Sequence, residues 1–82
     1  MGSMRRKIRI GVPSHISRSS GNLIMKAEHK ARIGMPVLDR EGRRIGFIYD
    51  LFGPVSSPYI AVRPTVENPE RYVDEPLYIL WG

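Results

Sequence analysis

The sequence contains no cysteine, which excludes a disulfide framework and a metal site built from thiolates. It also lacks a long apolar run, because no stretch approaches the roughly 18 apolar residues that a membrane-spanning helix needs. No apolar segment typical of a signal peptide follows the first residues. We therefore expect a soluble protein that works in the cytoplasm without a membrane partner.

The first residues, MGSM, have the form of a cloning scar followed by a second start at Met4. Residues 1–3 are therefore left out of the fold prediction, and residues 4–82 are expected to form a single β-barrel core domain. A domain of this size buries only about 60% of the surface that its unfolded chain exposes, so its core is modest.

Charge is distributed unevenly along the chain. Residues 1–44 hold eleven basic and three acidic residues, a net charge of +8, whereas residues 45–82 hold two basic and five acidic residues, a net charge of −3. This asymmetry suits a protein that works near RNA or an acidic partner, and it suits a solvated surface equally well. The basic residues that could lie near RNA are Arg5, Arg6, Lys7, Arg43 and Arg44.

The apolar residues alternate with polar ones as in β-strands, and no sustained helical stripe is present. Only residues 68–73 favour a short helical turn, since Asn68 could cap it, Pro69 could begin it and Glu70 would lie near its positive end. With no helix to cover the apolar face of the sheet, we expect a six-stranded, antiparallel-dominated barrel of the all-β class. Its strands are expected at 7–12, 22–27, 36–39, 44–52, 58–63 and 76–81.

The stretch RIGFIYDLF at 44–52 is apolar on both faces, because Phe47 and Leu51 take odd positions while Ile48 and Phe52 take even ones. One face of a strand in a small barrel is normally polar, so the second face is expected to be covered by a loop or by another protein. Gly53 and Pro54 then predict a sharp, stiff turn. A plain hairpin with its aromatic rings folded over the barrel mouth remains the alternative, and composition alone favours it.

Residues 42–64, GRRIGFIYDLFGPVSSPYIAVRP, resemble the core signature of the glycine- and arginine-rich accessory protein of H/ACA ribonucleoproteins, in its archaeal form. The upstream stretch HISRSSGNLIMKAEHKARIGMPVLD at 15–39 and the final PLYI also fit, so the resemblance covers nearly the whole chain. DLFGPV followed by PYIAVRP is its most specific part. The chain lacks the Gly/Arg-rich tails of the eukaryotic members, which makes RNA binding through such tails doubtful.

The resemblance implies a six-stranded split barrel with no catalytic residue and no cofactor. Such a subunit binds the catalytic subunit of the H/ACA pseudouridine synthase directly. It promotes loading, positioning and release of substrate RNA in guide-directed pseudouridylation of rRNA, a step of ribosome biogenesis. Contact with guide and substrate RNA is expected to be mostly indirect, within a particle that holds other H/ACA core proteins.

Carried over by position, the family pattern assigns partner binding to the hairpin, with Phe52 and Pro54 as the first anchors. Asp50 is expected to hold the backbone locally, with a salt bridge to the partner as the alternative. Gly46 is expected to shape the turn together with Asp50. The predicted partner-binding residues are Phe52, Gly53, Pro54, Val55, Pro58 and Tyr59. For Ile16, Leu23 and Met25, core packing is favoured over docking.

Two other functional classes were weighed against these residues. His15 and His29, near basic residues, could in principle serve as the acid and base of a ribonuclease, but nothing in the sequence fixes their geometry. No ligand spacing indicates a metal site. The stretch IGMPVLDREGRRIGFIYD at 33–50 also resembles the PRC-type barrel of a ribosome-maturation factor, so an RNA-binding barrel is the alternative function.

Overall fold

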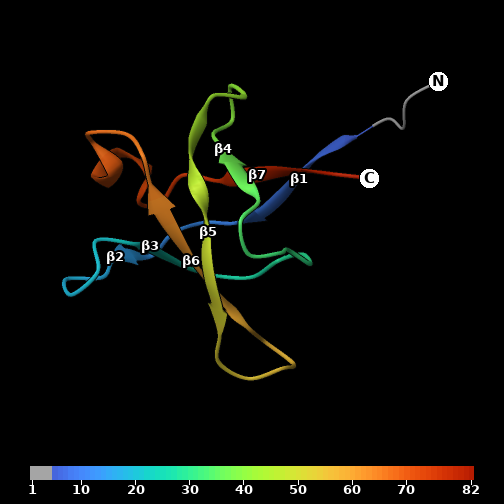
Figure 1. The fold of residues 1–82 in the computed structure, drawn as a ribbon, viewed down its shortest axis with the longest axis horizontal. Helices are drawn as coiled ribbons and strands as arrows, with labels where there is room; N and C mark the ends of the chain where they lie inside the picture. The colour runs from blue at the N-terminus through green and yellow to red at the C-terminus, as the bar shows by residue number, and fades with distance from the viewer. Residues whose placement is uncertain (1–4) are drawn as a thin grey trace.

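The computed structural model describes residues 5–82 and consists of short strands with one helical turn (Figure 1). Met1, Gly2 and Ser3, which the sequence predicts as a cloning scar, lie outside the described residues together with Met4. The elements are β1 (Arg6–Gly11), β2 (His15–Ile16), β3 (Leu23–Lys26), β4 (Pro36–Leu38), β5 (Arg44–Phe52), β6 (Tyr59–Pro64), the 3₁₀ helix η1 (Pro69–Tyr72) and β7 (Leu77–Trp81).

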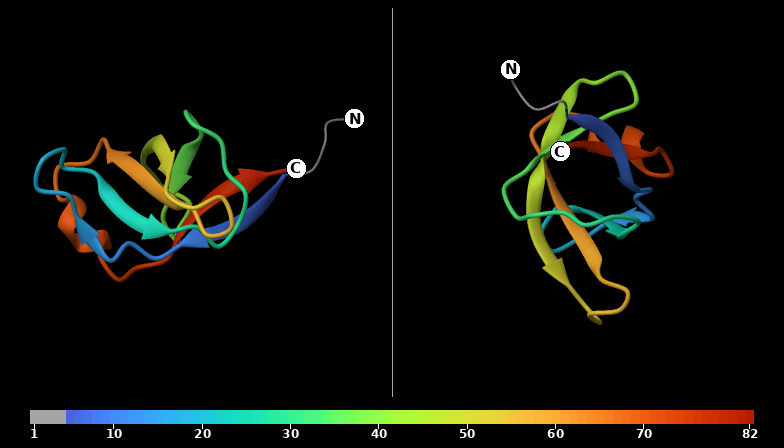
Figure 2. Two further views of the ribbon diagram at one scale, coloured as in Figure 1. Left: turned by 90° about the horizontal axis from the view of Figure 1, so that it is seen from below. Right: turned by 90° about the vertical axis from the view of Figure 1, so that its right-hand side faces the viewer.

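The strands of residues 5–82 form one antiparallel sheet in the order β1-β7-β4-β5-β6-β3-β2. The all-β class is therefore confirmed. The sheet curls around a common centre (Figure 2) but does not close into a barrel, since β1 and β2 are its two edges. A single backbone hydrogen bond, from Glu28 N to Ile10 O at 2.8 Å, joins the end of β1 to the segment after β3.

The described part of the chain has seven strands where the sequence predicts six, because the first predicted strand is followed by an extra two-residue strand. Residues 6–11 pair with β7, and His15 and Ile16 then pair with β3. Pro13 lies between them and has no N–H to donate to a ladder. The N-terminal segment therefore changes neighbours at this proline and counts as two strands.

The core fills the concave side of the sheet. Ile48, Ile60, Val62 and Ile79 are fully buried there, as the alternation of apolar and polar residues predicts. Leu23 and Met25 are buried as well, so both pack in the core rather than on a docking surface. Ile16 is half-buried against the same cluster. Burying each such side chain contributes about 1.5–3 kcal/mol relative to leaving it exposed.

One helical turn lies where the sequence expects it, at Pro69–Tyr72. Pro69 begins it and Glu70 lies in its first turn, but the Asn68 side chain makes no capping hydrogen bond, so that part of the prediction is wrong. The turn buries Tyr72 against the core. No helix within residues 5–82 is long and apolar enough to cross a membrane.

Strand β5 contains a bulge at Tyr49. Ile48 pairs with Val62, but the next pair joins Asp50 to Ala61, so Tyr49 is an extra residue on this strand. Because side chains alternate between the two faces of a strand, one extra residue exchanges the faces beyond it. Leu51 therefore lies opposite Ile60 on the inner side, while Phe52 lies opposite Tyr59 on the outer side.

Candidate protein-docking surface

Strands β5 and β6 form a hairpin that extends beyond the body of the molecule (Figure 1). Its turn is closed by a hydrogen bond from Ser57 N to Pro54 O at 3.1 Å. Ala27 N donates to Pro58 O at 2.9 Å, which ties the returning chain to the segment after β3. The prolines and these two bonds restrict the turn, so little conformational entropy remains to be lost when a partner binds.

Apolar side chains are exposed at the end of this hairpin. Val55 at the tip is fully exposed, while Phe52 and Tyr59 are 41% and 39% exposed. The two rings stack on each other across the ribbon, with centroids 5.6 Å apart and planes at 21°. Phe52 and Tyr59 thus form one aromatic surface on the outer side, and the predicted partner-binding residues are brought together at one end of the molecule.

Gly53 allows the Tyr59 ring to lie against the turn. Its φ is +89°, a region that other residues rarely adopt, and a Cβ there would come within 3.0 Å of Tyr59 Cδ2. We expect Gly53→Ala to lower the free energy of unfolding by about 2–3 kcal/mol, of which about 1–2 kcal/mol comes from the strained φ and about 1 kcal/mol from the displaced ring. Thermal unfolding measures this loss.

Gly21→Ala is the matched control for that variant. Gly21 has a comparable φ of +77°, but no atom lies within 4 Å of an added Cβ. The free energy of unfolding of Gly21→Ala should therefore fall only by the part that is due to backbone strain. Equal losses in the two variants would contradict a specific fit between Gly53 and the Tyr59 ring.

Asp50 and Gly46 act differently from each other. Asp50 Oδ1 accepts a hydrogen bond from Leu51 N at 2.9 Å, which is a local contact on the strand just before the turn. Gly46 lies within β5, opposite Pro64 and far along the strand from Gly53. The sequence had predicted that Gly46 shapes the turn. Its place in the structure is instead within the pairing of β5 with β6.

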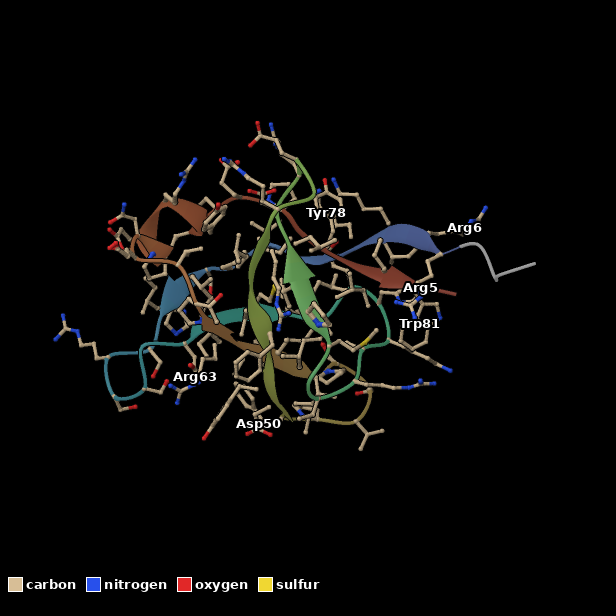
Figure 3. The ribbon with its side chains drawn as sticks, turned by 45° about the horizontal axis from the view of Figure 1, so that its top comes forward. Arg5, Arg6, Asp50, Arg63, Tyr78 and Trp81 are labelled. Carbon is tan, nitrogen blue, oxygen red and sulfur yellow. The ribbon has the colours of Figure 1, made fainter. Side chains whose placement is uncertain are left out.

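Sequence reasoning assigned no partner-binding role to Tyr49 or Arg63. Tyr49 is 49% exposed at the bulge, and the Arg63 guanidinium lies 5.0 Å from its ring centroid. Figure 3 shows Arg63 near the same end of the molecule as Asp50. The aromatic surface of the hairpin therefore continues along β5 and carries a cation at its edge. Apolar residues on both faces of 44–52 were the signal that could have revealed the bulge.

The basic residues that the sequence places near RNA do not gather at the hairpin. Arg5 and Arg6 lie apart from Asp50 and Arg63 (Figure 3). Lys7 lies over the Tyr78 ring, 4.7 Å from its centroid. Arg44 is exposed at the start of β5, the end of that strand opposite the hairpin turn.

Arg43 belongs to a polar cluster around the buried Asp39. Asp39 Oδ1 accepts from the backbone N–H groups of Glu41 and Arg43, both at 2.9 Å, and Oδ2 accepts from Tyr72 Oη and Arg43 Nε, both at 3.1 Å. Burial acts to raise the pKa of Asp39, but these hydrogen bonds outweigh it and hold that pKa below its ordinary value. The cluster fastens the β4–β5 loop to η1.

The two histidines lie on different elements. His15 Nδ1 is 2.8 Å from Ser14 Oγ, and His29 Nδ1 is 2.8 Å from Lys30 O while its ring meets Trp81 edge-on. His15 belongs to β2, whereas His29 lies in the β3–β4 loop. The Nδ1 atoms of the two histidines therefore contact different neighbours. Within residues 5–82, no group of three potential ligand side chains is arranged to hold a metal ion.

A hollow of about 390 Å³ lies on the inner side of the hairpin. Leu51, Pro58 and Ile60 line it from the hairpin, and Trp81 lines it from β7. The β3–β4 loop contributes the remaining wall. This hollow was not predicted, because its residues come from segments far apart in the chain.

Comparison with known proteins shows that the sequence is similar to an archaeal protein. No family model matches the sequence. The chain is 38% identical over 74 residues to an uncharacterized protein of Methanothermobacter thermautotrophicus, in an alignment that covers 85% of this chain and 79% of the relative. This chain belongs to the same protein family as that archaeal protein.

Proposed function

We propose that this protein is a non-catalytic accessory subunit of the archaeal H/ACA ribonucleoprotein, which binds the pseudouridine synthase catalytic subunit through the β5–β6 hairpin. One observation carries the proposal. The segment with the most specific resemblance, DLFGPV followed by PYIAVRP, is the segment that displays exposed aromatic side chains on a stiff turn. Aromatic side chains on a rigid support are typical of the residues that dominate protein interfaces.

In this role the protein works in the cytoplasm, in a particle with the other H/ACA core proteins. Its contact with guide and substrate RNA is mostly indirect, through the synthase whose loading, positioning and release of substrate it promotes. The basic N-terminal half then lies in the field of the RNA without reading its sequence. Exposed Arg5, Arg6 and Arg44 would contribute to that attraction.

Phe52→Ala tests the proposal. Removing an aromatic anchor from the centre of an interface costs about 2 kcal/mol or more, so we expect the Kd for the purified synthase subunit to rise about 30-fold. Isothermal titration calorimetry measures it, with guide RNA titrated in parallel. The stack with Tyr59 is lost as well, which should lower stability by about 1 kcal/mol and leave the protein folded.

Leu80→Ala is the matched control, since Leu80 on β7 is also 41% exposed and should leave the Kd unchanged. An unaltered affinity of a folded Phe52→Ala variant would reject Phe52 as an anchor. Tight binding of the wild-type protein to RNA, with none to the synthase, would instead establish an RNA-binding barrel of the PRC type and overturn the proposal.

A further inference from the structure

The hollow on the inner side of the hairpin has an apolar floor and a basic rim. Leu51, Pro58 and Ala27 provide aliphatic surface, and Trp81 of β7 also lines the hollow. Ile60 lies behind this lining and has no exposed surface of its own. Three residues of the β3–β4 loop complete the rim: His29, Lys30 and Arg32. Figure 3 shows Trp81 beside Arg5, at the end of β7.

No carboxylate lies among the residues that line this hollow. The neighbouring Glu28 side chain is already held by Arg9, with Nε to Oε1 at 2.8 Å. Lys30 and Arg32 form no ion pair with any side chain of residues 5–82. The rim therefore carries two exposed cations that are available to an acidic partner.

Two side chains of the β3–β4 loop already contact the Trp81 ring. The Arg32 guanidinium lies over it, 5.2 Å from the ring centroid, and the His29 ring meets it edge-on at 5.3 Å. Single-stranded RNA is bound by exposed aromatic faces together with a charged track. An aliphatic lining with a partly covered tryptophan suits an apolar protein side chain better, and the cations suit carboxylates beside it.

We infer that this hollow binds an extended segment of the catalytic partner in which an apolar side chain is flanked by Asp or Glu. The inference rests on the proposed function. Leu51 faces the hollow and Phe52, the next residue, faces the outer aromatic surface. A partner that covers Phe52 and Tyr59 reaches the hollow by passing around the edge of the hairpin. The partner thus holds the hairpin from both faces.

The experiment compares the double variant Lys30→Glu/Arg32→Glu with the matched control Arg18→Glu/Arg44→Glu. Both change the net charge equally, but Arg18 lies in the β2–β3 turn and Arg44 at the far end of β5. We expect the first to raise the Kd for the synthase subunit about tenfold at low salt, with a smaller effect at high salt. The control should change the Kd less than about threefold, because its charges lie outside the contact.

Each outcome bears on a different step. If the wild-type protein does not bind the synthase, the proposed function fails. A second outcome is that the wild type binds the synthase, Phe52→Ala weakens that binding, and Lys30→Glu/Arg32→Glu binds as tightly as the wild type. In that case the proposed function stands and the hollow is not part of the interface. If Lys30→Glu/Arg32→Glu binds the synthase as the wild type does but loses affinity for a polyuridine oligonucleotide, the hollow binds RNA and the inference is overturned.

The single variant Lys30→Glu is a further control, because it changes the charge of the rim and keeps the contact of Arg32 with Trp81. Lys30 is exposed, and its side chain forms no hydrogen bond or ion pair within residues 5–82. It should keep the wild-type unfolding temperature and still weaken synthase binding about threefold. Unchanged affinity of this variant, in a salt range where the double variant is weakened, would assign that weakening to the lost Arg32 contact and overturn the role of the basic rim.

Discussion

Gly46→Ala is expected to lower the free energy of unfolding by about 3 kcal/mol, the upper end of the cost of overpacking a well-packed site. An added Cβ would overlap the Arg63 carbonyl oxygen and come within 3.0 Å of Pro64 Cα. Both neighbours are backbone atoms of the paired strand, so no flexible side chain can move aside. For a domain of this size the unfolding temperature should fall by about 15 °C, as scanning calorimetry would show.

Gly42→Ala provides the comparison. Gly42 has a φ of +85°, and its added Cβ meets nothing within 4 Å, so that variant should lose only about 1–2 kcal/mol, from backbone strain. Since Gly46 has no positive φ, its larger loss would come from the close approach of β5 and β6. A loss at Gly46 no greater than at Gly42 would contradict that close approach.

Asp39→Ala should cost about 3 kcal/mol, because four donors converge on this buried carboxylate and would lose their acceptor. Asp39→Asn keeps one acceptor oxygen for the backbone N–H groups of Glu41 and Arg43, so its cost should be smaller, about 1–2 kcal/mol. Tyr72→Phe removes one donor alone and should cost about 1 kcal/mol. Chemical denaturation at neutral pH measures all three.

The same carboxylate predicts how stability depends on pH. The pKa of Asp39 is lower in the folded protein than its ordinary value, so its contribution is complete above the unfolded pKa of about 3.9 and is lost as the pH falls through the folded pKa. The stability difference between wild type and Asp39→Asn should therefore shrink as the pH falls below about 4. A difference that stays constant across this range would show that the charge of Asp39 does not stabilise the fold.

Local pattern was enough to predict most of the sheet. The alternation in 22–27 and 58–63 depends on burial of one face. The first segment contains β3, and the second covers β6 except for its last residue, Pro64. The turn at 68–73 was equally readable because Pro69 has a strong preference for the first helical position. β2 was missed because two residues cannot show a period, and its pairing with β3 is tertiary.

The features that the sequence could not show depend on contacts between distant residues. Tyr72 reaches Asp39 from 33 positions away, and no local preference predicts that partner. The hollow likewise needs Trp81 to return beside Leu51 and the β3–β4 loop. The exposed hairpin was predicted in better detail, since its glycine, prolines and apolar residues lie within a dozen positions.

The edge strand β1 bears on aggregation. Over most of its length it pairs only with β7, so its other side offers backbone N–H and C=O groups to any passing strand. Arg6, Lys7 and Arg9 are all exposed there, and two such edges would bring these like charges together. The basic N-terminus thus acts as a gatekeeper against fibril-like growth, and this role would constrain it even if no RNA were ever nearby.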